Sequence, residues 1–239
     1  MDNKKKILIF TATYNEKPNI EDLIFNIFKD YPFVHMLIID DNSPDKTANL
    51  VINFQNRYNN LHLIKRDQKL GLDTAHKIAY DYALENSYDY FISMDADLSH
   101  DPKEISNFLK NLEDYPFVIG SRYISGGKCL MHGKRLYTSK YGNMLIKFLL
   151  GINCNEYTTS YRGFNLNKLK PFKLSEVKSK GYSFFMGTII EIYKRKIKIK
   201  EIPIIFKDRV YGLSKIPKIE IFRTLKNLLI YFILRIFKN

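Results

Sequence analysis

Short apolar runs alternate with amphipathic segments through the first half of the chain. Each run is short for a helix and is bounded by polar or turn residues, so we predict buried strands at 7–12, 36–39, 61–64, 90–94 and 117–121. Between the first two runs, apolar residues recur three or four positions apart at Ile20, Leu23 and Ile27, the pattern of a helix with one buried face. Asn19 is placed to cap this helix, and Asp45 is placed to cap the next one.

The alternation continues with a predicted helix over 73–85 and another that begins near Pro102. Strands that alternate with helices form a mainly parallel sheet with helices on both faces, so we predict a Rossmann-like α/β fold. Ligands of such sheets bind beyond the carboxyl ends of the strands. Four carboxylates stand at predicted strand ends, and they are Asp40, Asp41, Asp95 and Asp97. We therefore expect the functional site at this edge of the sheet.

The second half of the chain has a looser pattern and ends in an apolar but charged tail. We predict a helix over 137–150, a strand over 198–206 and a helix over 219–237, with a mixed segment around 156–164. The charge-free part of the tail, 227–234, has eight residues, whereas a membrane-spanning helix needs about 18. We expect both helices to lie in a membrane interface. The alternative is that they only cover the sheet.

Composition narrows the class of partner. The chain has 239 residues and 45% hydrophobic side chains, enough for one large domain with a core. The 38 Lys and Arg residues outnumber the 25 Asp and Glu residues, and the net charge of +13 favours an anionic partner: a phosphorylated substrate, an anionic membrane or nucleic acid. Cys129 and Cys154 lack the spacing of a metal or disulfide framework, and the first residues lack a signal-peptide pattern. We expect a cytoplasmic protein.

The segment Asp95-Ala96-Asp97 carries the clearest chemical signal. Two carboxylates two residues apart, where a strand becomes a loop, can converge on one point once the strand ends. Mg²⁺ and Mn²⁺ prefer oxygen ligands, and Mg²⁺ usually keeps waters or substrate phosphate oxygens in its shell. The motif therefore predicts a metal site that a diphosphate completes. Acidic pairs also occur on solvated turns, which is the alternative for the motif taken alone.

Two other acidic segments and a basic group fit a nucleotide ligand. Asp40 or Asp41 can accept hydrogen bonds from a ribose or a base, although an Asx turn that caps the next helix is equally consistent. In the segment Thr13-Tyr14-Asn15-Glu16, the aromatic ring can flank a base and the Glu16 carboxylate can reach a base or ribose. Arginine forks suit phosphate oxygens, although single arginines also serve solubility. The basic candidates are Arg122, Lys134, Arg135, Arg162, Arg209 and Lys215.

Three other classes of protein share part of this pattern. A nucleic-acid-binding module would explain the charge and the 17 Tyr and 17 Phe residues, which can stack on bases, but not the carboxylates at strand ends. A nicotinamide-dependent oxidoreductase would share the α/β order, but no G-x-G-x-x-G follows the first strand. A nucleotidyltransferase could also use Asp-x-Asp with a metal, and it would release pyrophosphate.

The ordered motifs resemble those of the polyprenol-phosphate (dolichol-phosphate) mannose synthases and their glucosyl relatives, which are inverting glycosyltransferases of the GT-A fold. The resemblance extends over about 7–229 and is carried by the segments 13–16, 38–45, 70–75, 94–100, 120–123, 179–182 and 208–215. It implies a GT-A catalytic domain at 1–215 and an amphipathic membrane-interface helix at 216–239. The implied reaction moves a hexose, with mannose from GDP-mannose favoured, onto a polyprenyl or dolichyl phosphate. Glucose or an N-acetylhexosamine from a UDP-sugar is the alternative.

The resemblance also implies a location and partners. The enzyme would be peripheral at the cytoplasmic face of a membrane, would bind a nucleoside diphosphate sugar and a lipid phosphate, and would have no nucleic-acid partner. Some relatives extend into membrane-spanning helices, whereas this sequence ends before any such segment. A small membrane-anchoring subunit is therefore a candidate partner.

A role for each motif residue follows from the same resemblance. Asp95 and Asp97 would hold Mg²⁺ or Mn²⁺, with Ser99, where relatives often have Gln, as a third ligand. The nucleotide sugar would lie against Thr13, Tyr14, Glu16, Asp40, Asp41, Asp95, Asp97 and Arg122. The acceptor phosphate would bind Arg135, Ser139, Arg209 and Lys215. The catalytic set that stabilises the leaving diphosphate would be Asp95, Asp97, Arg122 and Arg209.

Three positions depart from the family pattern near the expected sugar. Glu156 stands where relatives have Asp, Gly187 where they often have Glu, and Asp73 where Gly is common. These departures leave the identity of the sugar open. The absence of a Glu at position 187 need not abolish activity, because the acceptor, a phosphate monoester, is largely dianionic near pH 7. It can attack the anomeric carbon without a general base, provided that the enzyme aligns it opposite the leaving diphosphate.

Overall fold

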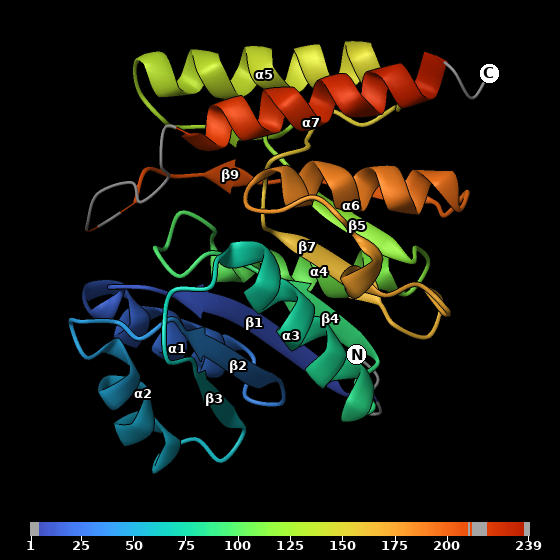
Figure 1. Cartoon of the computed structure of the whole chain (residues 1–239). Helices are drawn as coiled ribbons and strands as arrows, with labels where there is room; N and C mark the ends of the chain where they lie inside the picture. Colours follow the sequence, from blue (N-terminus) through green and yellow to red (C-terminus); the bar gives the residue numbers. More distant parts are fainter. Residues whose placement is uncertain (1–4, 210, 212–218, 237–239) are drawn as a thin grey trace.

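The computed structural model describes residues 5–209, 211 and 219–236, and Figure 1 shows their arrangement. This part of the chain contains a seven-stranded sheet in the order β3-β2-β1-β4-β7-β5-β8. Its strands are β1 (Ile7–Thr13), β2 (His35–Asp40), β3 (Leu61–Lys65), β4 (Tyr90–Ser93), β5 (Phe117–Ser121), β7 (Arg162–Asn165) and β8 (Ile199–Pro203). β7 runs antiparallel to β4 and β5, whereas the other neighbouring pairs are parallel.

Helices cover both faces of the sheet. On one face lie α1 (Lys17–Asp30), α2 (Thr47–Gln55) and α4 (Ile105–Leu112), and on the other lie α3 (Leu72–Glu85) and α6 (Ser183–Lys194). Because strand side chains alternate in direction, Ile7 and Ile9 of β1 join the core under α1, whereas Leu8 and Phe10 join the core under α3. The predicted mainly parallel sheet flanked by helices is confirmed.

Two long helices form a further layer outside α6. α5 (Lys134–Leu150) and α7 (Ile219–Ile236) contact each other, and α7 also contacts α6. Figure 1 shows the pair side by side at the top of the molecule, far from β2 and β3. Ile146 and Leu150 of α5 and Leu228 of α7 join the core under α3 and α6. None of the described helices is both long enough and apolar enough to cross a bilayer.

The two predicted helix caps have different outcomes. α1 begins at Lys17, so Asn19 lies in its first turn rather than before it, and that prediction is wrong. Pro18 explains the early start, because proline fits the first turn of a helix, where its missing N–H is not needed. Lys46 is the N-cap residue of α2, so Asp45 lies one position before the cap. Its side chain nevertheless accepts the backbone N–H of Thr47, the first residue of α2, at 3.0 Å, and so satisfies a donor at the start of the predicted helix.

The late strands also differ in part from expectation. The predicted strand at 198–206 is divided into β8 and the short β9 (Ile205–Phe206), which pairs with β6 (Lys128–Cys129). The mixed segment at 156–164 contains most of β7, which the sequence pattern did not reveal. Gly163 in β7 allows a close approach of α4, since a Cβ there would lie 2.9 Å from Phe108 and 3.0 Å from Leu112.

Candidate active site

A cavity of about 500 Å³ opens beside the carboxyl ends of β1, β2 and β4. Its walls are residues 12–14 and Glu16, segments 69–74, 95–97 and 180–182, and Asp41, Arg209, Glu220 and Arg223. The position is the one expected for a ligand of a parallel α/β sheet. The structure thus brings together candidates that lie far apart in the sequence, from Thr13 to Arg209.

Asp95 is held by two loops that follow β4 and precede β7. Its backbone N–H donates to Nδ1 of His100 at 3.0 Å, and its Oδ1 accepts the Ser160 hydroxyl at 2.5 Å. Burial lowers the pKa of His100, and Nδ1 already accepts a hydrogen bond, so this ring is neutral near pH 7. The Asp95 side chain is 38% exposed and therefore remains open to a ligand in the cavity.

Asp97 is fixed by its own turn and by Arg209. Leu98 has a left-handed backbone conformation, with φ at 62°, and this turn directs Ser99 back toward Asp97. The Ser99 hydroxyl donates to Asp97 Oδ1 at 2.5 Å, and the Ser99 N–H donates to the same oxygen at 3.2 Å. Arg209 Nη2 lies 3.2 Å from Asp97 Oδ2. Ser99 is only 1% exposed, and in this arrangement its hydroxyl orients Asp97.

The cavity wall has an excess of carboxylates. Six acidic side chains face four basic ones: Glu16, Asp41, Asp73, Asp95, Asp97 and Glu220 against Lys69, Lys180, Arg209 and Arg223. Desolvation by the surrounding cavity wall raises the pKa of Asp95, and the charge of Asp97 adds to this effect, although the hydrogen bond from Ser160 and the charge of Arg209 oppose it. A divalent cation at Asp95 and Asp97 would offset this repulsion, so the donor set fits Mg²⁺ or Mn²⁺.

The donor set for a metal is small. Within the described ranges, no group of three or more His, Cys, Asp or Glu side chains could hold a metal ion together. Two carboxylates at Asp95 and Asp97 fit an ion that completes its shell with water and with phosphate oxygens of a ligand. The site thus has the donor atoms that a metal–diphosphate complex needs.

Asp40 and Asp41 have different environments at the end of β2. Asp40 is 1% exposed and accepts three hydrogen bonds, from the Thr13 hydroxyl at 2.7 Å, the Ser43 hydroxyl at 2.6 Å and the Ser43 N–H at 2.9 Å. Asp41 lines the cavity and forms an ion pair with Arg66. Asp40 therefore joins the ends of β1 and β2, whereas Asp41 is the member of the pair that a ligand can reach.

Arg66 is a site-forming residue that the sequence pattern did not single out. It follows β3 directly and is 8% exposed. Besides the Asp41 ion pair, its guanidinium donates to the Thr74 hydroxyl at 2.6 Å and to the Gly71 carbonyl at 3.1 Å. The side chain thus ties the end of β2 to the loop that begins α3. The one sequence feature that could have identified Arg66 as a site residue is its position just after a predicted strand.

The segment after β1 forms the opposite wall. The Tyr14 ring lies 4.1 Å from the Lys69 ammonium, in a cation–π contact between the two walls. Glu16 is 8% exposed and accepts a hydrogen bond from the Asn19 side chain at 2.8 Å. Tyr14 therefore presents an aromatic ring beside the cavity, and Glu16 is placed by the first turn of α1.

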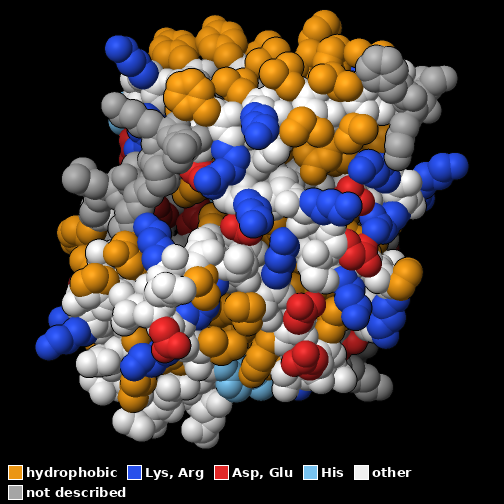
Figure 2. All heavy atoms as spheres, viewed as in Figure 1, with side chains coloured by type: hydrophobic (Ala, Val, Ile, Leu, Met, Phe, Trp, Pro, Cys, Tyr) orange, Lys and Arg blue, Asp and Glu red, His pale blue; other side chains and the backbone are white. Residues whose placement is uncertain are grey.

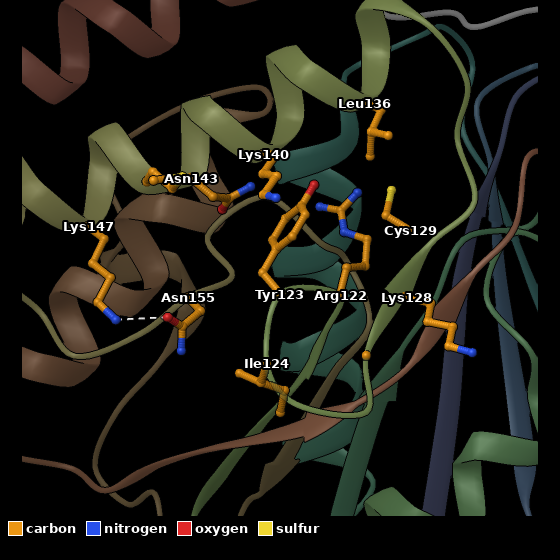
Figure 3. Close-up of a pocket in the computed structure, with 12 residues that line it drawn as sticks. Arg122, Tyr123, Ile124, Lys128, Cys129, Leu136, Lys140, Asn143, Lys147 and Asn155 are labelled. Carbon is orange, nitrogen blue, oxygen red and sulfur yellow. Dashed lines mark hydrogen bonds between the residues drawn. The ribbon is translucent and has the colours of Figure 1, made fainter.

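Arg122 lies in a second cavity, of about 470 Å³, under α5. Its guanidinium donates to both carboxylate oxygens of Glu156 at 2.7 Å and to the Thr158 hydroxyl at 2.8 Å. Burial alone would lower the pKa of Arg122, but the buried Glu156 raises it above its ordinary value. Figure 3 shows Arg122 and Tyr123 extending from the end of β5 toward α5, near Lys140.

The predicted acceptor contacts and the remaining basic candidates are spread over several parts of the molecule. The Ser139 hydroxyl accepts from Tyr123 at 2.7 Å, and the exposed Arg135 lies 3.4 Å from Asp208. Lys134 begins α5, whereas Lys215 lies outside the described residues. Arg162 is 1% exposed and donates to the backbone carbonyls of Tyr157, Thr159 and Phe185. It therefore joins three backbone segments and is not available to a phosphate.

Comparisons with known proteins show which family this sequence and fold belong to. The family sequence model "Glycosyl transferase family 2" matches residues 8–171. The chain is 34% identical over 214 residues to a polyprenol monophosphomannose synthase of Mycolicibacterium smegmatis, with 88% of this chain and 81% of that protein covered. It is 30% identical over 211 residues to an undecaprenyl-phosphate mannosyltransferase of Micrococcus luteus, with 88% and 87% covered.

Solved structures share the fold at lower sequence identity. A glucosyl-3-phosphoglycerate synthase of Mycobacterium tuberculosis, in complex with Mn²⁺, UDP and its glucosylated product, has a TM-score of 0.67 at 16% identity, with 97% of this chain and 80% of that chain covered. A mannosyltransferase of Pyrobaculum calidifontis, in complex with GDP-mannose and Mn²⁺, has a TM-score of 0.58 at 18% identity, with 100% and 66% covered. The sheet order, the strand-end carboxylates and these matches agree: the chain belongs to glycosyl transferase family 2, and the predicted enzyme class, a glycosyltransferase, is confirmed.

Proposed function

We propose that the protein transfers mannose from GDP-mannose to the phosphate of a polyprenyl lipid, with inversion of the anomeric carbon. One observation carries the proposal: Asp95 and Asp97 share a cavity with the first turn of α7, an outer helix whose apolar side chains are exposed. A nucleotide-sugar site that opens beside such a helix suits a lipid acceptor. The relatives named for mannosyl transfer to polyprenol and undecaprenyl phosphates support both the sugar and the acceptor.

Asp95 and Asp97 would hold Mg²⁺ or Mn²⁺ together with the diphosphate of the donor. When bound, the ion supplies positive charge that stabilises the leaving diphosphate. The Mn²⁺ in the two structural neighbours supports a divalent metal. Ser99 would serve the site by orienting Asp97, and a direct role as third ligand would require its present hydrogen bond to break.

The nucleoside would lie between the walls formed by Tyr14 and by Asp41. The aromatic ring of Tyr14 suits a base face, and the Asp41 carboxylate suits donors on a base or ribose. Arg66 fixes the Asp41 carboxylate, while Asp40 and Thr13 hold the two strand ends in place. Glu16 completes this end of the cavity.

The transfer needs alignment and charge compensation more than proton chemistry. The lipid phosphate is itself the nucleophile, and one of its oxygens forms the bond to the anomeric carbon as the bond to the nucleoside diphosphate breaks. Arg209, beside Asp97, is placed to stabilise negative charge on the reacting phosphates. Arg135, Ser139 and Lys215 stay the predicted contacts of the acceptor phosphate.

Arg122 would act on this site through its neighbours. It pairs with Glu156 in the second cavity, and the same loop continues to Ser160, whose hydroxyl donates to Asp95. We infer that the Arg122–Glu156 pair positions this loop and so keeps Asp95 oriented. A direct contact of Arg122 with phosphate would use the N–H groups that remain after Glu156 and Thr158 are bonded.

The outer helices would bring the enzyme to the cytoplasmic face of a membrane. Figure 2 shows hydrophobic side chains gathered along the top of the molecule, where α5 and α7 lie. On α5 the most exposed aromatic is Phe148, at 80%, and on α7 it is Phe222, at 72%. Exposed apolar faces on amphipathic helices are typical of helices that lie in a lipid interface. Lys140 and Lys147 of α5 line the cavity beneath this helix. A small membrane-anchoring subunit stays a candidate partner.

The deciding measurement is release of nucleoside diphosphate, with Mg²⁺ or Mn²⁺, in the presence and absence of a polyprenyl phosphate. GDP-mannose, UDP-glucose and UDP-N-acetylglucosamine should be compared, in detergent and in liposomes. Lipid-dependent release from GDP-mannose supports the proposal, and lipid-dependent release from a UDP-sugar instead supports the glucosyl or N-acetylhexosaminyl alternative. If no donor gives lipid-dependent release, the lipid acceptor is wrong. Binding to an oligonucleotide that weakens steeply with salt would then favour the nucleic-acid alternative.

A further inference from the structure

The first turn of α7 forms part of the active-site wall. Glu220 and Arg223 line the same cavity as Asp95, Asp97 and Arg209. From Phe222 onward, the same helix exposes apolar side chains on the outer surface of the molecule. One short stretch of helix therefore borders both the catalytic cavity and the surface proposed to meet the lipid.

Glu220 connects this turn to the opposite wall. It is 7% exposed, and its Oε2 accepts the backbone N–H of Tyr182 at 2.9 Å. The neighbouring N–H, that of Gly181, donates to the Asp73 side chain at 2.9 Å. Gly181 has φ at 60°, and a Cβ there would lie 2.1 Å from the Glu220 carboxylate. The 180–182 turn is therefore held between an acid of α3 and an acid of α7.

Arg223 is the basic group that this arrangement presents to the cavity. Its Nη1 forms an ion pair with Glu220, and its side chain is 44% exposed. A guanidinium carries further N–H donors on two other nitrogens, in the planar geometry that suits phosphate oxygens. Arg223 follows Phe222 directly and precedes Leu225, both of which are exposed. Its charge thus lies where the cavity meets the apolar outer face.

We propose that Arg223 binds the phosphate of the lipid acceptor at the mouth of the cavity, and that Glu220 is a positioning residue that holds Arg223 and the 180–182 turn in place. The inference rests on the proposed function and deepens it. A lipid phosphate must leave the plane of the membrane surface to approach Asp95 and Asp97. A guanidinium on the helix proposed to contact the membrane shortens this path. Its positive charge also offsets part of the negative charge of a cavity wall that has an excess of carboxylates.

The test uses the full-length protein and a short-chain prenyl phosphate that is soluble without vesicles. Arg223→Met removes the charge and keeps the aliphatic part of the side chain. Lys226→Met is the matched control, because Lys226 lies on the same helix, is exposed and does not line the cavity. Calorimetric binding of the prenyl phosphate, without donor, should weaken about ten-fold or more in Arg223→Met and stay unchanged in Lys226→Met.

A kinetic measurement separates the acceptor from the donor. In Arg223→Met the KM for the prenyl phosphate should rise, while the KM for the nucleotide sugar stays unchanged. Arg223→Lys should restore part of the affinity because it restores the charge without the fork. Glu220→Gln should weaken binding of the acceptor less than Arg223→Met does, because a glutamine oxygen can still accept the Tyr182 N–H.

Each outcome decides between the inference and the proposed function. Arg223-dependent binding of the prenyl phosphate supports the inference even if no donor is turned over, and in that case the proposed function alone fails. Equal binding by the wild type and Arg223→Met overturns the inference and leaves the proposed function intact. A wild-type protein that does not bind the prenyl phosphate overturns both. Equal losses in Arg223→Met and Lys226→Met indicate a general charge effect and also overturn the inference.

Discussion

The proposed donor side and the proposed acceptor side of this molecule are built in different ways. On the proposed donor side, carboxylates stand at the ends of buried parallel strands, and two of them are held in part by neighbours only a few residues away, as Ser99 holds Asp97 and Ser43 holds Asp40. On the proposed acceptor side, the cavity wall is completed by the first turn of α7, a helix that exposes apolar side chains such as Phe222 outward. Under the proposed function, the donor would thus be recognised mainly by residues at the strand ends of the sheet, whereas the acceptor side would need the membrane lipid to cover its apolar surface.

The largest expected effect is on the donor side. Asp97→Ala removes a carboxylate of the candidate metal site and the partner of Arg209. Because loss of a bound metal removes several kcal/mol of charge stabilisation in the transition state, we expect sugar transfer to fall by about 10³-fold or more. Activity against Mg²⁺ and Mn²⁺ concentration measures the loss. The control is Asp114→Asn, which removes an exposed carboxylate near the start of β5 and should leave activity unchanged.

The variant also tests the division between the two sides. Asp97→Ala should bind a short-chain prenyl phosphate nearly as well as the wild type does, because Asp97 is not among the proposed acceptor contacts, which are Arg223 together with Arg135, Ser139 and Lys215. A large loss of acceptor binding would show that donor and acceptor sites depend on one another. Retention of metal-dependent activity would contradict the assignment of Asp97 itself.

The next effect is on stability beneath the acceptor side. Glu156→Gln leaves the buried Arg122 without its counter-charge, and removal of one partner from a buried ion pair costs about 3–5 kcal/mol. Urea unfolding should report this loss. The comparison is Glu191→Gln on α6, where the partners Lys194 and Arg195 are 47% and 35% exposed, and where we expect about 1 kcal/mol or less. Similar losses of stability in Glu156→Gln and Glu191→Gln would show that the buried Arg122–Glu156 pair contributes no more than an exposed ion pair.

For a physical reason, the sequence revealed the carboxylates at strand ends but not the contacts between distant segments. Apolar strands and the acids that follow them are adjacent in the chain, so the pattern reveals both, and the structure places Asp41, Asp95 and Asp97 around one cavity. Contacts between distant segments leave no such pattern. Glu220 reaches Tyr182 across 38 positions, and Arg66 reaches Asp41 across 25.

The strand β7 was missed for the same reason. It runs antiparallel between β4 and β5, within a sheet that is otherwise parallel. Its sequence, Arg-Gly-Phe-Asn, lacks an apolar run, and only its position between two buried strands explains why it is extended. The predicted boundary between a domain at 1–215 and a helix at 216–239 stays a prediction, and α7 begins at Ile219.

A smaller effect concerns pH and the core between the two sides. His76 of α3 is buried against Phe184 and Phe185 of α6, and burial lowers its pKa from 6.5 to about 4. Since the folded protein keeps this ring neutral while the unfolded chain protonates it, stability is complete above about pH 6.5 and falls as the pH drops toward 4. At pH 5 the loss from this group is about 2 kcal/mol.

Urea unfolding at pH 7 and pH 5 measures this effect. His76→Gln should be less stable than the wild type at pH 7, but should lose about 2 kcal/mol less between the two pH values. His132→Gln, at an exposed position before α5, is the matched control and should change the pH dependence little. If His76→Gln and the wild type lose the same stability between pH 7 and pH 5, His76 is not the group responsible.

The smallest expected effect tests whether the acceptor side is completed by lipid. Phe148→Ser and Phe222→Ser each remove an exposed aromatic ring from the outer helices, with 80% and 72% of the residue accessible. A Phe side chain transferred out of water contributes about 1.5–3 kcal/mol, so each change should weaken binding to anionic vesicles by about ten-fold. Phe25→Ser on α1, where Phe25 is 45% exposed, is the control and should leave binding unchanged. Because Phe25, Phe148 and Phe222 do not line the active-site cavity, turnover with a vesicle-free prenyl phosphate should be unchanged in all three variants. Equal loss of vesicle binding in Phe25→Ser would show that the apolar surface of α5 and α7 has no special role.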